Sequence, residues 1–202
     1  MIAIVEAAGW PIWPLVLASV VALCIILERL WALRRDRVVP ASVLHSTVDE
    51  VKNKGITQDL LDRLAGGSLL SRIFAVGLRN SQRSREVMKE SIEESGRIAA
   101  HELERFLTTL GSIASLAPIM GLLGTVVGMI EIFGAQSPTG GNPEQLARGI
   151  SVALYNTAFG LIVAIPSMIF YRHFRAHVDS LVVEMEMQAL KLVDIIHSQR
   201  EE

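Results

Sequence analysis

Three long runs without a charged side chain constrain the fold more than any other feature of the sequence. No Asp, Glu, Lys or Arg lies within residues 7–27, 106–130 or 149–171. Each run is close to the roughly 20 apolar residues with which a helix crosses a hydrocarbon layer ~30 Å thick. Buried helices of soluble proteins usually have shorter apolar runs and keep a polar face. The sequence therefore predicts an all-α integral membrane protein with three transmembrane helices.

The distribution of basic residues predicts how these helices are oriented. Of the 19 Lys and Arg residues, only Arg148 lies before the first run or between the second and third. Because Lys and Arg concentrate on the cytoplasmic side of a membrane, the N-terminus is expected outside and the C-terminus inside. A basic cluster at residues 29–37 follows the first run, which favours an uncleaved membrane helix over a signal peptide.

These signals divide the chain into seven segments. They are a periplasmic N-terminus (1–9), transmembrane helix 1 (10–33), a cytoplasmic helical segment (34–105), transmembrane helix 2 (106–133), a periplasmic loop (134–148), transmembrane helix 3 (149–171) and a cytoplasmic C-terminal helix (172–202). In the cytoplasmic segment, Pro40 is expected to precede one helix and Gly55 to end it, and the pair Gly66 and Gly67 marks a turn.

The second and third transmembrane helices are expected to extend into the cytoplasm. From about Ser84 the apolar pattern reaches the second span without a helix breaker, which predicts one uninterrupted helix. After the third span a helical apolar stripe continues over residues 178–196. Three helices alone offer little to cover that stripe, which favours an oligomer.

Small residues and prolines are unusually frequent in the second and third spans. In lipid, close backbone approach and hydrogen bonds hold helices together, because no hydrophobic effect drives their association. Close helix packing is therefore predicted at Pro118, Gly121, Gly124 and Gly128 in the second span and at Ala153, Gly160 and Ala164 in the third. Pro166 is expected to bend the third helix.

Thr125 and Thr157 lie among these small residues. Thr125 is six residues from Glu131 and Thr157 is eight from Gly149, so both lie about 9–12 Å below the outer boundary of the membrane. At such similar depth, the two hydroxyls either line one polar path or each satisfy a carbonyl of their own helix. Spacing alone leaves both interpretations open.

The uncharged runs also contain no His, and the acidic residues of the spans, Glu28 and Glu131, lie at span ends. A proton relay in the membrane usually needs such a titratable group. If the chain conducts protons, a second chain must therefore supply the carrier.

The sequence offers no sign of catalysis or of a bound cofactor. It has no H-E-x-x-H motif, no pair of intramembrane aspartates and no nucleophile elbow, so we expect no enzyme. His173 and His177 are four residues apart, a spacing that can bind a metal, but they lie among arginines where lipid headgroups are the better ligand. No metal site, no cofactor and no nucleic-acid partner are expected.

The stretches "LAPIMGLLGTVVGMIEIF" and "ISVALYNTAFGLIVAIPSMIFY" resemble the two signature helices of the ExbB/TolQ/MotA family. Members are stator-like subunits of ion-driven bacterial motors. The resemblance extends to the first span and to the three-span arrangement, so it covers essentially the whole chain. The forms "GLLGTV" and "AIP" are more similar to ExbB and TolQ than to the four-span MotA.

The resemblance implies a pentamer around a central pore in the bacterial inner membrane, whose second and third helices surround two helices of an ExbD- or TolR-like partner. An aspartate of that partner carries H⁺ or Na⁺, and the inward flow drives a TonB-like protein for transport at the outer membrane. Thr125 and Thr157 are then the pore-lining hydroxyls, and Pro118, Gly121, Gly124 and Gly160 allow a close, smooth inner surface around the partner. Val152 stands where many ExbB and TolQ sequences have a glutamate, so a mechanism that protonates the pentamer itself does not carry over.

Two other functions remain open on the sequence. One is a TolQ-like subunit that serves envelope maintenance or division. The other is a passive membrane scaffold, for which the acidic residue of the partner would be dispensable.

Overall fold

The computed structural model describes residues 9–134 and 143–201, which are almost entirely helical and contain no strand. The helices of these residues are α2 (Ile12–Ala32), α3 (Arg35–Val38), α4 (Ser42–Lys54), α5 (Gln58–Ala65), α6 (Leu69–Arg79), α7 (Arg85–Leu103), α8 (Leu107–Gly134) and α9 (Pro143–Glu201). Of the predicted N-terminal segment 1–9 and loop 134–148, residues 1–8 and 135–142 lie outside the described residues, and residues 143–148 form the start of α9.

Three helical stretches are long and apolar enough to cross a membrane, as predicted. They are Ile12–Ala32, Leu107–Gly134 and, within α9, Gly149–His197. α9 is continuous over 59 residues, which corresponds to about 88 Å at 1.5 Å per residue. The prediction that the third helix extends well past the membrane-spanning run is confirmed.

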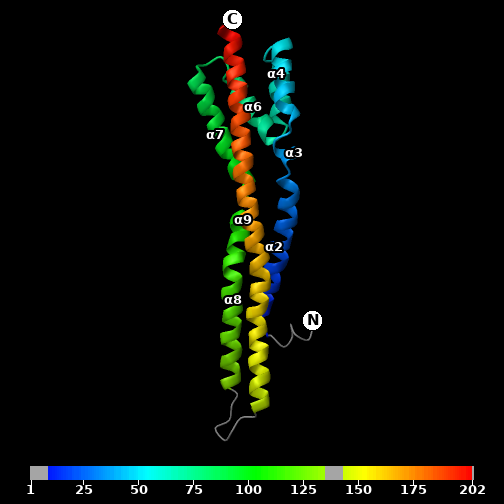
Figure 1. Ribbon diagram of the computed structural model, residues 1–202, viewed down its shortest axis with the longest axis vertical. Coiled ribbons are helices and arrows are strands. Elements are labelled where there is room, and N and C mark those ends of the chain that lie inside the picture. The colour runs from blue at the N-terminus through cyan, green and yellow to red at the C-terminus, as the bar shows by residue number, and fades with distance from the viewer. Residues whose placement is uncertain (1–8, 135–142, 202) are drawn as a thin grey trace. The chain divides into compact units, whose positions relative to one another are not determined.

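The chain forms two compact units. The first unit comprises Met1–Arg29 and Phe106–His173, and the second comprises Leu30–Arg105 and Phe174–Glu202. Within the first unit, α8 and the first part of α9 run side by side in opposite directions (Figure 1). The first unit therefore contains most of each predicted transmembrane helix.

The core of the first unit joins all three of its helices. Leu15 of α2 is fully buried and packs with Ala117 of α8 and with Val163 and Ala164 of α9. Small side chains on α8 and α9 leave room for the larger Leu15. In lipid, such complementary packing holds helices together, because the hydrophobic effect does not act between them.

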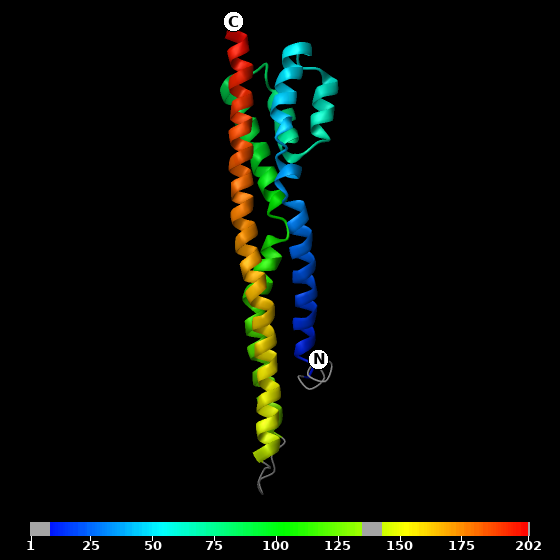
Figure 2. The same cartoon turned by 45° about the vertical axis from the view of Figure 1, so that its right-hand side comes forward.

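The short helices of the second unit have defined ends, and the sequence predicts the one at Gly55. Gly55 ends α4 with φ of 72°, a left-handed conformation that glycine adopts without strain. Thr57 and Ser68 begin α5 and α6 with side-chain caps. Figure 2 shows α4 and α5 as neighbouring helices, and an ion pair of Arg63 with Glu50 joins them.

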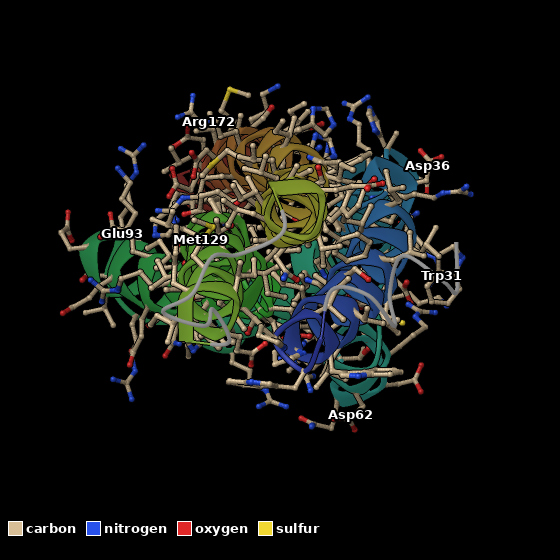
Figure 3. The ribbon with its side chains drawn as sticks, turned by 90° about the horizontal axis from the view of Figure 1, so that it is seen from below. Trp31, Asp36, Asp62, Glu93, Met129 and Arg172 are labelled. Atoms are coloured by element: carbon tan, nitrogen blue, oxygen red, sulfur yellow. The ribbon has the colours of Figure 1, made fainter. Side chains whose placement is uncertain are left out.

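Charged side chains of the second unit lie on its outer surface. Figure 3 shows Asp62 at the outer edge of α5 and Glu93 at that of α7, and both are exposed. Arg35 donates a hydrogen bond of 2.9 Å from Nε to Glu184 Oε2 of α9. This bond from Arg35, more than any other contact, lowers the pKa of Glu184.

The apolar stripe of α9 is covered within the chain, which corrects one expectation. The stripe residues are buried in the second unit, at Val178, Leu181, Met185, Ala189, Val193 and Ile196. α7 reaches α9 through an ion pair of Arg85 with Asp194, and the end of α2 reaches it where Leu33 O lies 2.9 Å from His177 Nε2. The stripe therefore gives no argument for an oligomer, because other helices of the second unit already cover it, and the oligomeric state stays a prediction.

The second predicted helix is interrupted where the sequence indicates continuity. α7 ends at Leu103, α8 begins at Leu107, and Phe106 between them has φ of 65°. This left-handed conformation costs a bulky residue about 1–2 kcal/mol. The Arg29 guanidinium lies 5.7 Å from the centroid of the Phe106 ring, and this cation–π contact offsets part of the cost. The prediction of one helix from Ser84 is wrong because a tertiary contact stabilises the break.

Replacing Phe106 by alanine and by glycine separates backbone strain from ring contact. Both F106A and F106G lose the contact with Arg29, but only glycine relaxes the left-handed backbone. We expect F106A to be less stable than F106G by about 1 kcal/mol, measured by unfolding of the purified protein in detergent. Equal stability of the two variants would show that the positive φ carries no cost.

The ion pair of Arg35 with Glu184 predicts an acid-sensitive contact in the second unit. Because the pKa of Glu184 is lowered in the folded chain, its contribution is complete above its unfolded pKa of about 4.3 and is lost as the pH falls further. We expect the stability of E184Q to depend less on pH than that of the parent below about pH 5. Thermal unfolding between pH 6 and pH 3 measures this, with E186Q, whose carboxylate is exposed, as a control. Parallel pH profiles for the parent and E184Q would contradict it.

Candidate functional site

Thr125 of α8 and Thr157 of α9 meet between their two helices. Their hydroxyl oxygens lie 2.5 Å apart, within hydrogen-bonding distance, and both residues are half-buried. The sequence placed the two hydroxyls at a similar depth from residue counts alone. The structure brings them into direct contact.

Backbone carbonyls complete the surroundings of the two hydroxyls. Thr125 Oγ1 lies 3.3 Å from Gly121 O and 3.2 Å from Ala153 O, and Thr157 Oγ1 lies 3.2 Å from Gly121 O. We call these four oxygen atoms the oxygen cluster. Gly121 O is the carbonyl one turn before Thr125, so the Thr125 hydroxyl has an acceptor on its own helix as well as partners across the helix pair.

Hydrogen bonding in the oxygen cluster has two possible directions. Each hydroxyl carries one proton. In one arrangement Thr157 donates to Thr125, which donates to Ala153 O or to Gly121 O. In the other, Thr125 donates to Thr157, which donates to Gly121 O. Both arrangements leave lone pairs on hydroxyl oxygens, so the cluster is able to accept a hydrogen bond or contact a cation.

Glycines let the two helices approach closely enough for this contact. A Cβ atom on Gly121 would lie 2.7 Å from Asn156 O, and one on Gly160 would lie 2.6 Å from Ala117 O. A Cβ on Gly128 would come within 3.1 Å of the Ala153 side chain. These predicted packing positions join α8 to α9 of the same chain. Their predicted role around the helices of a partner stays a prediction.

The other predicted residues lie along the same helices. Pro118 is half-buried in α8, and Ala164 is buried in the core beside Leu15. Val152, at the position of the family glutamate, is half-buried. α9 continues through the exposed Pro166, and the bend predicted there stays a prediction.

Asn156, which precedes Thr157 in α9, was not among the residues predicted from the sequence. Asn156 is 1 % exposed and lies against Gly124 of α8. A buried amide is costly in lipid unless it has polar contacts or a specific place to pack. The signal was present, because Asn156 carries the only side-chain amide within residues 149–171.

Charged groups are found at the ends of the first unit's helices. Arg29 binds Glu28 with nitrogen–oxygen distances of 2.5 and 2.7 Å, and Glu131 is exposed near the end of α8. In the part of the chain that the structure describes, no three His, Cys, Asp or Glu residues come together as a metal site would require. The polar groups described here away from the helix ends, the oxygen cluster and Asn156, are neutral.

Comparison with known proteins places this sequence in a family. A model of the MotA/TolQ/ExbB proton channel family matches residues 66–187, which include all of α8 and the oxygen cluster. The chain belongs to the MotA/TolQ/ExbB proton channel family. The resemblance seen in the two signature stretches is thereby confirmed.

Relatives within the family carry both ExbB and TolQ names. The biopolymer transport protein exbB1 of Vibrio cholerae is 29% identical over 168 residues, which cover 81% of this chain and 74% of that protein. The biopolymer transport protein ExbB of Aquifex aeolicus is 34% identical over 133 residues, 64% of this chain and 89% of its own length. The Tol-Pal system protein TolQ of Pseudomonas aeruginosa is 31% identical over 160 residues, with 71% and 69% covered.

The hydroxyl contact predicts an energetic coupling between the two threonines. In a double-mutant cycle of T125V, T157V and the double variant, we expect a coupling energy of about 0.6 kcal/mol and at most about 1.7 kcal/mol, the average and the maximum for hydrogen bonds between membrane helices. Unfolding of the purified protein in detergent measures the cycle. As a control, T109V on the exposed side of α8 should show no coupling with T157V. Strictly additive effects of T125V and T157V would contradict the contact.

Proposed function

We propose that the chain is the pore-forming subunit of an energy-transducing complex in a bacterial inner membrane. In this proposal it couples the proton or sodium motive force, through an ExbD/TolR-like partner, to a TonB-like protein that energises transport at the outer membrane. The observation that carries the proposal is the oxygen cluster, in which two hydroxyls meet within the uncharged runs 106–130 and 149–171.

The uncharged runs support a role for this chain as the wall of the ion path, with the ion carrier on another protein. Proton carriers in membranes are usually carboxylates or histidines, and none occurs within residues 106–130 or 149–171. The carrier is therefore proposed to be an aspartate on a single-span partner helix. This chain supplies the neutral polar wall past which the loaded carboxyl group moves.

The oxygen cluster is suited to that role in two ways. Thr125 and Thr157 can accept a hydrogen bond from a protonated carboxyl, and they can donate to a carboxylate by reversing the direction of their hydrogen bonds. Their oxygen atoms, with the carbonyls of Gly121 and Ala153, are also the type of ligand that Na⁺ prefers over nitrogen or sulfur. The same geometry therefore supports transfer of either ion.

A pentamer that surrounds the partner is part of the proposal. The glycines of α8 and α9 bring two backbones together in each chain, so that each subunit presents a narrow pair of helices to a central pore. An ion that crosses the membrane field releases about 2.3 kcal/mol per charge per 100 mV. A few ions thus provide enough free energy to move the inner helices by one step.

A TolQ-like role in envelope maintenance or division is the second candidate. It is favoured by the match to the Tol-Pal system protein TolQ of Pseudomonas aeruginosa, whose identity to this chain equals that of the ExbB relatives to within a few per cent. Both candidates use the same ion path, and they differ in the periplasmic protein that receives the force. A passive scaffold would need no ion path.

Valine substitutions of the two threonines test the ion path. T125V and T157V keep the shape of the side chain and remove the hydroxyl, so we expect ion flux through the reconstituted complex with its partner to fall at least tenfold for each. T109V, which alters an exposed residue of α8, should keep normal flux. Normal flux in both T125V and T157V, with the complex assembled, would overturn the proposed role and leave the scaffold.

A further inference from the structure

The packing of Asn156 against α8 connects it to the oxygen cluster. Asn156 is 1 % exposed, although an amide has two donor hydrogens and an acceptor oxygen that favour water. In the chain it directly precedes Thr157. A residue of this polarity at the centre of an apolar helix pair needs a specific role.

Two successive glycines of α8 accommodate Asn156. A Cβ atom on Gly124 would lie 2.8 Å from both Cβ and Cγ of Asn156 and 3.1 Å from its Nδ2. A Cβ on Gly121 would lie 2.7 Å from the backbone oxygen of the same asparagine. Contacts under 3.0 Å are not tolerated, so Asn156 fits against α8 only where α8 has no side chain.

On both helices, the residue that makes this fit directly precedes one of the two threonines. Gly124 is followed by Thr125 and Asn156 is followed by Thr157. A shift of α9 along α8 that moved Asn156 off Gly124 would separate the two hydroxyls, which now lie 2.5 Å apart. A hydrogen bond does not survive a displacement of one ångström or more.

We propose that Asn156 is a positioning residue, which holds the Thr125 and Thr157 hydroxyls together through the fit of its side chain against Gly124. Its importance for ion transfer rests on the proposed function. The geometric part is independent of transport, because it concerns only how α8 and α9 align. The amide group provides a flat, branched end that fills the space above the glycine, whereas an alanine would leave that space empty.

Disulfide formation between cysteines at the two threonine positions reports the alignment directly. The parent for this test is the full chain with T125C and T157C, in which C24S removes its single native cysteine. A disulfide needs Cα atoms about 4.4–6.8 Å apart and a restricted dihedral angle, so its rate of formation is sensitive to small shifts. Oxidation of this parent in membranes should give an efficient crosslink within the monomer.

Three changes in this parent separate positioning from general packing. We expect G124A to lower the crosslinking rate at least fivefold, because its methyl group collides with Asn156. N156A should lower the rate about threefold, because the space above Gly124 is empty. The double variant G124A/N156G adds a methyl group on α8 and removes the side chain that it would meet on α9. It should recover at least half of the parent rate. G134A, where a Cβ meets no atom within 4 Å, is the matched control.

The outcomes distinguish this inference from the proposed function. Recovery in G124A/N156G, together with a loss in G124A and N156A, supports positioning even if T125V and T157V turn out to transport ions normally. An unchanged rate in N156A, or a double variant as slow as G124A, would overturn the positioning role. Helix content and thermal unfolding of each variant are measured alongside. A variant that has lost its fold is replaced by G124S or N156S, for which the same direction of change is expected.

Discussion

Direct contact between the backbones of α8 and α9 is the constraint on which the rest of the first unit depends. Gly160 lies so close to α8 that a Cβ atom would come within 2.6 Å of Ala117 O, and Gly121 is equally restricted. In lipid, such contact provides the dispersion attraction that the hydrophobic effect provides in water. Hydroxyls with short side chains meet across a helix pair only when the backbones are this close. The oxygen cluster is therefore a consequence of the glycines.

The two units differ in where their charged side chains lie. Apart from Arg29 with Glu28, the ion pairs that we describe belong to the second unit, and they join its short helices to one another and to α9. The charged groups of the first unit's spans, Glu28, Arg29 and Glu131, lie near the span ends. In the proposed function, a charge that moves past the uncharged runs is therefore not held by a fixed opposite charge of this chain.

Much of this architecture could be predicted from the sequence, because lipid leaves few choices. Apolar length gave the three spans, Gly55 ended a helix as expected, and small residues indicated the contact of α8 with α9. Features that depend on tertiary contacts could not be predicted in this way. The break at Phe106 has no glycine or proline to mark it, and it is stabilised by Arg29, 77 positions away in the sequence. The place of Asn156 opposite Gly124 likewise depends on how α9 aligns with α8.

Ion flux through liposomes that contain only this purified chain tests whether the moving charge comes from another protein. The uncharged spans predict that the chain alone gives no more proton or sodium flux than empty liposomes under a membrane potential. Addition of a single-span partner with a carboxylate in its helix should produce flux, and exchange of that carboxylate for an amide should abolish it. Sustained flux through the chain alone would contradict a carrier supplied by a partner.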